Sequence, residues 1–429
     1  MNKKAWLISV NMGYGHQRTA FALRDLAFGG KNINANDYEN ILKADRNTWE
    51  ATRKGYEAVS SFKRFPLIGN FVFSIMDYFQ RILSFYPKRN LSSPNFQLKQ
   101  NFNLIKKGWG RDLIEKLKSQ SPKLSFISTF FTPAFAAEYF NYPGEIFCVV
   151  CDADISRAWA PLEPSKSRIK YFAPTERVVE RLKLYGVKPA NIFFTGYPLP
   201  EENIGGQDME ILKEDLKFRL LNLDPQKKYF FKYKGLIKEK LGDLPEKSDH
   251  PLTLMFAVGG AGAQKEIPIK ILKKLSGRIK NREIKIILVA GIKEKIRNGF
   301  IKNVHNLKLE KFLNKGIDII FEKKIEDYFE KFNQALRKTD ILWTKPSELS
   351  FYSALGLPII IAPTIGSQED FNKRWLLKSG FGISQENPDY LEDWLFDWIS
   401  RGYLAEAAMQ AFVKGEQLGV SKIKKIICG

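Results

Sequence analysis

Long apolar runs are absent from this sequence, and cysteines are few. No stretch approaches the ~20 uninterrupted apolar residues that a membrane-spanning helix needs. The opening stretch, MNKKAWLISVNMG, joins two lysines to an apolar run that is short and leads into a glycine turn rather than a cleavage site. We therefore expect a buried strand here and no signal peptide, in a chain that is soluble or peripheral to a membrane.

The chain has three cysteines and three histidines. Cys148 and Cys151 have the C-x-x-C spacing of some metal and redox sites, but they fall in the apolar run 146–151 with no second Cys or His pair nearby. We interpret both as small core side chains of a strand. No metal and no cofactor is predicted, and so few cysteines are typical of the reducing cytoplasm.

Acidic residues are outnumbered, with 47 Asp and Glu against 68 Lys and Arg, which gives a formal net charge of +21. Such a field attracts anionic membranes, nucleic acids or phosphorylated substrates. The basic residues are spread over 213–219, 227–247 and 422–425, and the first two segments alternate with acidic residues as on solvated helix faces. No nucleic-acid signature is present, so no nucleic-acid partner is expected.

A chain of 429 residues is longer than one ordinary domain with a single hydrophobic core, so we predict two domains. Each begins with a strand, a glycine-rich turn and a helix. The first turn contains Gly13, Gly15 and His16, and the second contains Gly259, Gly260 and Gly262. Such turns aim backbone N–H groups at ligands beside the carboxyl end of a strand. The alternative is a helix start that merely needed glycine, since a full dinucleotide fingerprint is missing.

Strand and helix patterns alternate along both halves, as in βαβ units. The predicted fold class is α/β. We divide the chain into an N-terminal domain, a Lys-rich linker elaboration, a C-terminal domain and a helical tail, at residues 1–203, 204–250, 251–395 and 396–429.

Aromatic and basic residues gather between 49 and 90, as in KRFPLIGNFVFSIMDYFQRILSFYPKR. Phe71, Phe79 and Arg81 belong to an amphipathic pattern that suits a helix lying on an anionic membrane surface. The alternative is a helix packed on its own domain.

The stretch 344–372, TKPSELSFYSALGLPIIIAPTIGSQEDFN, resembles the nucleotide-sugar site of one group of glycosyltransferases. That group makes monogalactosyldiacylglycerol, glucosyl-diacylglycerols and lipid II. The matching residues are Lys345, Pro346, Gln368, Glu369 and Asn372, and the resemblance covers nearly all of the chain outside about 208–249. It implies the GT-B architecture, two Rossmann-like domains facing across a cleft.

The resemblance also implies residue roles on the acceptor side. His16 ends a Gly-rich loop and would face the acceptor as a base, with Asp152 as a second candidate base or an orienting group. Arg157 and Trp159 would lie near the acceptor or the membrane. Ser156 stands where the family has a histidine, which removes one acceptor-side group.

On the donor side, Gln368 and Glu369 would bind sugar hydroxyls, and the loop 322–325 would hold the nucleobase through its backbone. The residues assigned to the donor are Gly15, Gly259, Gly260, Gly262, Ile325, Lys345, Ser347, Gln368, Glu369 and Asn372. Ser347 and Glu348 replace two family glycines, and Ser353 replaces a ribose-binding Glu. A carboxylate at Glu348 would repel a diphosphate unless it is turned away.

The implied reaction is an inverting, metal-independent transfer of a sugar from a nucleotide diphosphate, a UDP-sugar, to a hydroxyl of a lipid or another membrane-associated acceptor. The expected location is the cytoplasm, with peripheral binding at the inner face of the plasma membrane. An Asp152-x-Asp154 metal clamp is the lesser alternative for that segment. Two other functions stay open: a catalytically degenerate GT-B binding or scaffold protein, and a sugar-nucleotide epimerase of the same architecture.

Overall fold

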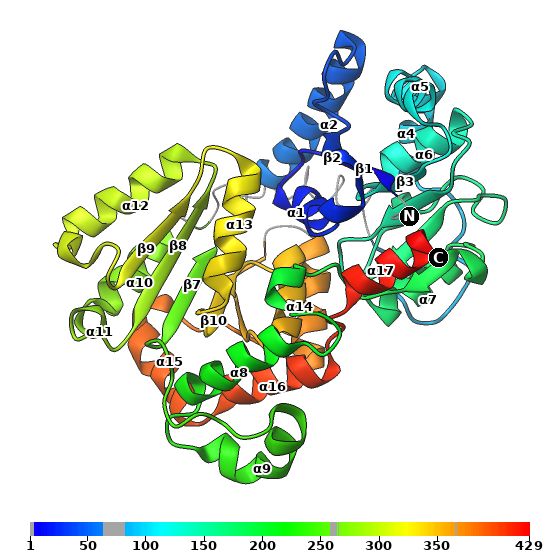
Figure 1. Ribbon diagram of the computed structural model, residues 1–429. Helices are drawn as coiled ribbons and strands as arrows, with labels where there is room; N and C mark the ends of the chain where they lie inside the picture. The colour runs from blue at the N-terminus through cyan, green and yellow to red at the C-terminus, as the bar shows by residue number, and fades with distance from the viewer. Residues whose placement is uncertain (1–3, 63–81, 258–263, 265, 365–366) are drawn as a thin grey trace. The chain divides into compact units, whose positions relative to one another are not determined.

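The computed structural model describes residues 4–62, 82–257, 264, 266–364 and 367–429 (Figure 1). It divides into two compact units. The first comprises 1–198, 365–372 and 418–429, and the second comprises 199–364 and 373–417. The chain therefore first passes from the first unit to the second between residues 198 and 199. The sequence patterns had placed this domain boundary between residues 203 and 204.

The first unit is built on a parallel sheet of six strands in the spatial order β2-β1-β3-β4-β5-β6. The strands are β1 (Ala5–Ser9), β2 (Ala27–Asn34), β3 (Ser125–Ser128), β4 (Ile146–Val149), β5 (Lys170–Ala173) and β6 (Ile192–Phe194). Its helices are α1 (Tyr14–Ala22), α2 (Lys43–Phe62), α4 (Phe96–Lys106), α5 (Arg111–Gln120), α6 (Phe131–Tyr139), α7 (Glu176–Leu184) and α17 (Gly419–Cys428).

Both faces of this sheet are buried, because successive side chains of β1 point to opposite faces and pack in two different core clusters. Trp6 and Ile8 belong to a core cluster that includes side chains of α5, α6 and α7. Ala5 and Leu7 point to the other face and pack in a second cluster with side chains of α1 and α17. Helices on both faces of a parallel sheet define the doubly wound, Rossmann-like arrangement.

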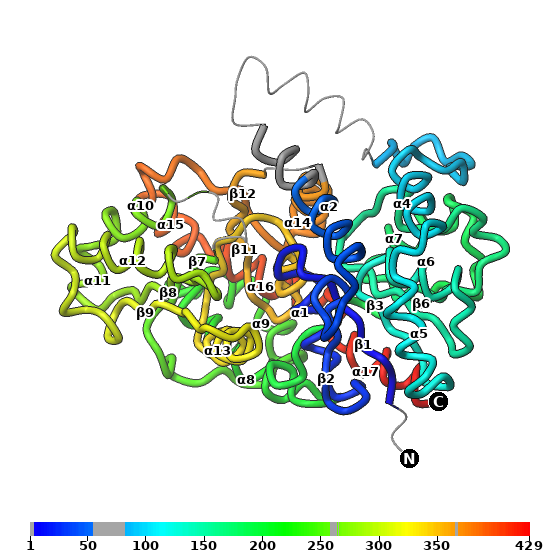
Figure 2. The backbone as a smooth tube through the Cα atoms, turned by 90° about the horizontal axis from the view of Figure 1, so that it is seen from above, coloured from blue at the N-terminus to red at the C-terminus, as the bar shows by residue number. Residues whose placement is uncertain are grey.

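The last helix of the chain packs beside its first strand and helix (Figure 2). Val420 and Ile423 of α17 are buried in the same cluster as Leu7. Lys424 Nζ lies 3.0 Å from an oxygen of Asp25. The predicted tail, 396–429, is thus split, because only residues 418–429 of it group with the first unit.

The second unit repeats the plan with a parallel sheet in the order β12-β11-β10-β7-β8-β9. The strands are β7 (Thr253–Ala257), β8 (Lys285–Gly291), β9 (Ile317–Phe321), β10 (Ile341–Thr344), β11 (Ile359–Ile361) and β12 (Gly382–Ser384). Its α-helices include α8 (Glu210–Leu223), α9 (Lys228–Leu241), α10 (Glu266–Lys274), α11 (Ser276–Lys280), α12 (Glu294–Asn306), α13 (Ile325–Leu336), α15 (Leu391–Ser400) and α16 (Tyr403–Lys414). Helix α14 (Ser367–Ser379) begins in residues grouped with the first unit and continues in the second.

The segment predicted as a Lys-rich linker elaboration is an integral part of the second unit. Arg219 of α8 is fully buried and donates to the carbonyls of Thr339 (2.8 Å) and Leu355 (2.7 Å). Burial lowers the pKa of its guanidinium. The lysine-rich composition conceals this core contact, because the lysines occupy the solvent side of helices whose leucines are buried.

The predicted α/β class with two Rossmann-like domains is confirmed. The buried strand predicted for the opening stretch is β1, and the glycine turn after it leads into α1.

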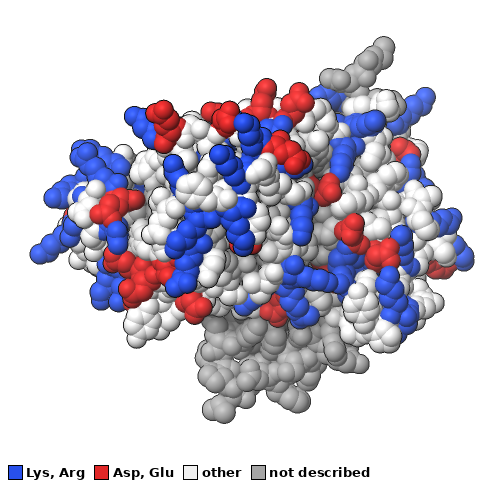
Figure 3. All heavy atoms as spheres, turned by 90° about the horizontal axis from the view of Figure 1, so that it is seen from below, with Lys and Arg blue, Asp and Glu red and all other residues white. Residues whose placement is uncertain are grey.

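Charged groups of both signs alternate on the face drawn in Figure 3 rather than forming a single basic patch. Among the residues that the structure describes, no helix is long and apolar enough to span a membrane.

Candidate active site

The strand order gives the first unit a switch point at β1. From β1 the chain turns to β2 on one side, and β3 then pairs with β1 on the other. In open α/β sheets ligands bind outside the carboxyl ends of the strands at such a point. The first turn of α1, shortly after β1, carries His16, and the loop after β3 carries Thr129, so two remote segments of the sequence meet here.

The ring of His16 is held in one tautomer. Its Nδ1 lies 2.7 Å from the carbonyl oxygen of Thr129, and an edge-on contact with the ring of Phe130 (4.9 Å between centroids) fixes its plane. A carbonyl oxygen can only accept, so Nδ1 carries a hydrogen, and in the neutral ring the lone pair is then on Nε2. The half-buried imidazole in its neutral form has the tautomer that a general base at Nε2 requires.

A buried polar network lies behind His16. The hydroxyl of Thr19 bonds to the carbonyl of Gly15 (2.8 Å) and lies 2.9 Å from the Tyr197 hydroxyl. The sulfur of Cys151 lies 3.3 Å from the Thr19 hydroxyl and 3.6 Å from His16 Nδ1. These contacts hold α1, and with it His16, against the segments that follow β3, β4 and β6.

Cys148 and Cys151 are both buried, and burial raises the pKa of the Cys148 thiol. Cys148 lies in β4 within the core cluster. Cys151 follows the strand and contacts the network around His16. The core interpretation therefore fits Cys148, whereas Cys151 has polar neighbours that its apolar run did not indicate. Among the described residues no group of three or more His, Cys, Asp and Glu side chains could hold a metal.

Asp152 follows β4 and is half-buried. One of its carboxylate oxygens accepts from Nδ2 of Asn372 (3.3 Å), while Oδ1 of Asn372 accepts from the backbone N–H of Ala153 (2.8 Å). Asn372 groups with the first unit and is 1% exposed. The structure thus brings together two predicted site residues, a candidate base and a residue assigned to the donor.

The neighbouring Asp154 belongs to a buried ion pair. Its two oxygens each accept a 2.8 Å hydrogen bond from the guanidinium of Arg181, and both side chains are at least nine-tenths buried. This bidentate pairing occupies the carboxylate that an Asp-x-Asp metal clamp would need. The lesser alternative for this segment, a metal site, has no support from the geometry.

Arg157 and Trp159, which were predicted to lie near the acceptor or the membrane, both have buried side chains. Arg157 is 3% exposed, and its guanidinium donates to the carbonyls of Ser92, Ala160 and Pro161. Trp159 is 2% exposed and packs edge-on against Phe131. The short 3-10 turn Arg157–Trp159 directs both side chains inward, which charge and an indole at a strand end could not indicate.

The second unit has its own switch point, between β7 and β10. The hydroxyl of Thr344, at the end of β10, donates to the carbonyl of Ala257 at the end of β7 (3.2 Å). The half-buried Lys345 comes next in the chain. Gly259, Gly260 and Gly262, in the loop after β7, lie outside the described residues.

The 3-10 helix Glu348–Leu355 follows. Ser347 and Glu348, which stand where the resembled family has two glycines, lie at its start. Ser347 caps it, its hydroxyl accepting from the N–H of Leu349 (3.4 Å). Ser353 is fully buried and its hydroxyl donates to the Ser350 carbonyl (2.8 Å). A side chain turned inward in this way does not replace a ribose-binding glutamate.

The remaining predicted donor residues that the structure describes lie at the starts of helices. Gln368 and Glu369 lie in the first turn of α14 and are half-buried. Ile325 begins α13, directly after the loop 322–324. Gly15 lies in the first turn of α1. Phe71, Phe79 and Arg81 lie outside the described residues.

Sequence reasoning missed Thr129, Thr19 and Tyr197. Thr129 acts through its backbone, so its side chain gives no signal. The position just after a predicted strand could have indicated Thr129, because the ends of parallel strands share one edge of the sheet.

Comparison with known proteins identifies distant relatives. Residues 245–313 match a family model described as a domain of unknown function (DUF6938). The chain is 22% identical over 390 residues to a processive diacylglycerol beta-glucosyltransferase of Bacillus pumilus, which covers 89% of this chain and 83% of that one. The same name, identity and coverage apply to a Bacillus subtilis protein over 396 residues. The predicted resemblance to this group is confirmed.

Among solved structures, MurG of Acinetobacter baumannii is similar with a TM-score of 0.47 and 12% identity over 99% of both chains. UDP-GlcNAc 2-epimerase of Neisseria meningitidis, bound to UDP-GlcNAc, has a TM-score of 0.44 and 12% identity over 99% of this chain and 98% of that chain.

Proposed function

We propose that this chain is a glycosyltransferase that moves a sugar from a nucleotide diphosphate, a UDP-sugar, to a hydroxyl of a diacylglycerol-type lipid. The observation that carries the proposal is His16, held at a switch point by the contact of its Nδ1 with the Thr129 carbonyl, which in the neutral ring leaves Nε2 as the basic nitrogen. The similarity to diacylglycerol glucosyltransferases over 89% of the chain supports the substrate class.

In the proposed reaction, Nε2 of His16 takes the proton of the acceptor hydroxyl. The acceptor oxygen forms a bond to the anomeric carbon, and the bond from that carbon to the diphosphate oxygen breaks. The nucleoside diphosphate leaves with the electron pair. Direct displacement of this kind inverts the anomeric configuration, and Asp152 would orient the acceptor or support the charge that develops on the imidazole.

The departing diphosphate would be stabilised by backbone N–H groups and by Lys345 at the second switch point, so the reaction needs no metal and no cofactor. Gln368 and Glu369 would bind the hydroxyls of the sugar. The pairing of Asp154 with Arg181 favours this metal-free scheme, because it removes one ligand from the alternative clamp.

A second candidate is a binding protein of the same architecture without turnover. It is favoured by the inward position of Ser353 and by the charge at Glu348. No comparable observation on the described residues favours the third predicted function, a sugar-nucleotide epimerase.

The experiment is to incubate the full chain with UDP-glucose, with and without diacylglycerol vesicles, and to measure UDP release and lipid-bound hexose. UDP release that depends on the lipid is expected. Calorimetric binding of UDP without any lipid-dependent release would favour the binding protein. Failure to bind either UDP or a UDP-sugar would refute the donor assignment.

A further inference from the structure

The first turn of α1, which carries His16, starts at a glycine rather than at a capping side chain. Its N-cap residue is Gly13, at φ +107°, which has no side chain to bond to the N–H groups at the helix start. Gly15, in the same turn, adds backbone freedom. The position of His16 therefore depends on contacts made beyond this turn.

Thr19, one helical turn later and fully buried, links this turn to Tyr197. Its hydroxyl oxygen lies 2.8 Å from the carbonyl oxygen of Gly15 and 2.9 Å from the hydroxyl of Tyr197. A threonine hydroxyl has one hydrogen, and the Gly15 carbonyl is a closer and stronger acceptor than the sulfur of Cys151 at 3.3 Å. The hydrogen of Thr19 thus goes to Gly15, and the phenol of Tyr197 donates to Thr19. Hydrogen bonds run in one direction from Tyr197 to the residue before His16.

The backbone around Tyr197 is fixed. The N–H groups of Thr195 and Gly196 both donate to the carbonyl of Ala173 at the end of β5, at 3.1 and 3.3 Å. Pro198 follows, and a proline restricts the residue before it to an extended backbone. The side chain of Tyr197 is confined as well, because the residue is only 2% exposed. A phenol held in this way can fix the hydroxyl to which it bonds.

The last helix of the chain lies directly on this backbone. Gly419, the first residue of α17, is so close that a Cβ there would lie 2.3 Å from the carbonyl oxygen of Tyr197 and 3.1 Å from that of Gly196. No side chain fits at such a distance, so the approach requires glycine. The next residue, Val420, belongs to the same core cluster as Ala20 of α1. Helix α17 therefore supports both of the segments that the hydroxyl contact joins.

From these contacts we propose that Tyr197 is a positioning residue for His16, and that α17 sets the position of Tyr197 by lying on its backbone. The phenol holds the hydroxyl of Thr19, and that hydroxyl holds the first turn of α1. Nδ1 of His16 thereby stays on the Thr129 carbonyl, and Nε2 stays the basic nitrogen. The inference rests on the proposed role of His16 as the base, but the state of the imidazole ring can be measured without any substrate.

The test is an NMR spectrum of the ring nitrogens of the full chain made with ¹⁵N-labelled histidine, at about pH 8, where histidine is ordinarily neutral. The chain has three histidines, and replacing each in turn assigns the signals. In the wild type, separate signals for Nδ1–H and for Nε2 of His16 are expected. In Tyr197→Phe the two signals should move towards one another, because both tautomers become populated. The kcat of lipid-dependent UDP release should fall about tenfold, with KM within about twofold, because a displaced base slows the reaction without weakening binding.

The control for Tyr197→Phe is Tyr171→Phe. It removes another buried phenol of the first unit, which donates to the carbonyl of Trp159 at 2.9 Å. The signals of His16 should not move in this variant. Equal effects of Tyr171→Phe and Tyr197→Phe would overturn the proposal, because any loss of a buried phenol would then suffice.

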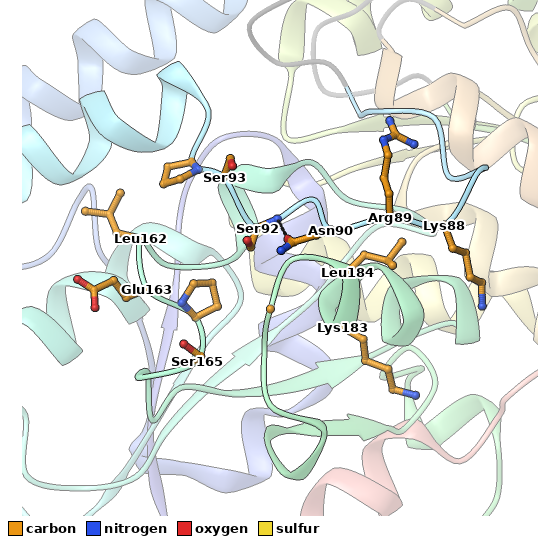
Figure 4. Close-up of a pocket in the computed structure, with 13 residues that line it drawn as sticks. Lys88, Arg89, Asn90, Ser92, Ser93, Leu162, Glu163, Ser165, Lys183 and Leu184 are labelled. Atoms are coloured by element: carbon orange, nitrogen blue, oxygen red, sulfur yellow. Dashed lines mark hydrogen bonds between the residues drawn. The ribbon is translucent and has the colours of Figure 1, made fainter.

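A matched pair at Thr19 separates the hydroxyl from packing. Thr19→Ser keeps the hydroxyl and should retain the wild-type spectrum, whereas Thr19→Val keeps the shape and should show mixed tautomers and about tenfold lower kcat. The control is Ser165→Ala at a hollow of about 760 Å³ in the same unit, lined by segments 88–94, 162–165 and 183–186 (Figure 4). None of the residues that line this hollow takes part in the contacts between α17, Tyr197, Thr19 and His16, so Ser165→Ala should change neither measurement.

Gly419→Ala tests the contribution of α17. The added methyl group has to push the helix away from Tyr197, so mixed tautomers of His16 are expected. Gly299→Ala adds the same group to α12, where nothing lies within 4 Å of it, and should have no effect. A wild-type spectrum in Gly419→Ala would overturn the part assigned to α17.

Tyr197→Phe and Thr19→Val each change one hydroxyl, so they decide the question even if Gly419→Ala unfolds. A single His16 tautomer in both variants would overturn the positioning role of Tyr197, whatever the turnover. Mixed tautomers in both, in a chain whose wild type releases no UDP with lipid, would support the positioning role and refute the proposed sugar transfer.

Discussion

The two switch points of this chain differ in how their side chains are held. At the first, His16 is bonded to Thr129 and backed by Thr19, Cys151 and Tyr197. At the second, Thr344 bonds to Ala257, but the next turn has Ser347 as a helix cap and Ser353 turned into the core. The first unit thus holds a candidate base in place, whereas the second departs from the family pattern at Ser347 and Ser353.

The largest expected effect breaks the first switch point. His16→Ala should lower lipid-dependent UDP release by about 10²- to 10⁴-fold, because general-base catalysis contributes that much. The control is His305→Ala, which removes a histidine whose side chain is 76% exposed in the second unit. Steady-state release with matched melting curves measures the effect. Unchanged turnover in His16→Ala would move the base to Asp152.

The next effect compares two buried arginines that donate to backbone carbonyls, one in each unit. Arg219→Met should lower the free energy of unfolding by about 3 kcal/mol, because several buried carbonyls lose their donor. Arg157→Met should cost a similar amount in the first unit. The control Lys217→Met lies on the same helix as Arg219 and breaks only a 3.9 Å contact with Glu214. Denaturant unfolding checks this, and a loss below about 1 kcal/mol for Arg219→Met would mean that α8 is held by its leucines alone.

A smaller effect tests the second switch point. Glu348→Gln removes one negative charge without changing size, and UDP should bind about fivefold more tightly if that carboxylate repels the diphosphate. Glu326→Gln, at an exposed position of α13, is the control. Calorimetry with UDP measures both. Weaker binding in Glu348→Gln would indicate that Glu348 accepts a hydrogen bond from the nucleotide.

The smallest effect is a pH dependence within the second unit. His250 lies 3.2 Å from Asp340 and 2.5 Å from Asp249; burial lowers its pKa, but hydrogen bonds to these carboxylates outweigh burial and raise it above 6.5 overall. The stability gained from protonated His250 is therefore fully present below pH 6.5 and is lost as the pH rises through the folded pKa. One proton limits the slope to about 1.4 kcal/mol per pH unit.

His250→Gln should flatten this part of the profile in urea unfolding. His305→Ala, at an exposed position, should leave it unchanged. A wild-type stability that is level above pH 6.5 would contradict the assignment.

Repeating patterns made the fold predictable, and long-range contacts limited what could be said of the site. The apolar strand before each of the two glycine turns indicates two Rossmann-like units, because hydrophobic period and turn residues are local properties of the sequence. The tautomer of His16 depends on a carbonyl 113 residues away, and the burial of Arg219 depends on carbonyls more than 115 residues away. Arg157 shows the same limit, since its charge suggested a surface and its backbone turn directs it inward.

The return of α17 to the first unit has a consequence for biosynthesis. A ribosome makes β1 first, yet Val420 and Ile423, which share a core cluster with Leu7, emerge only after the whole of the second unit. The face of the first sheet that α17 covers therefore stays partly exposed while roughly two hundred further residues are synthesised. At bacterial and eukaryotic rates this takes on the order of ten seconds or more. During that interval the nascent chain exposes an apolar sheet face, which is the period in which a chaperone would matter most.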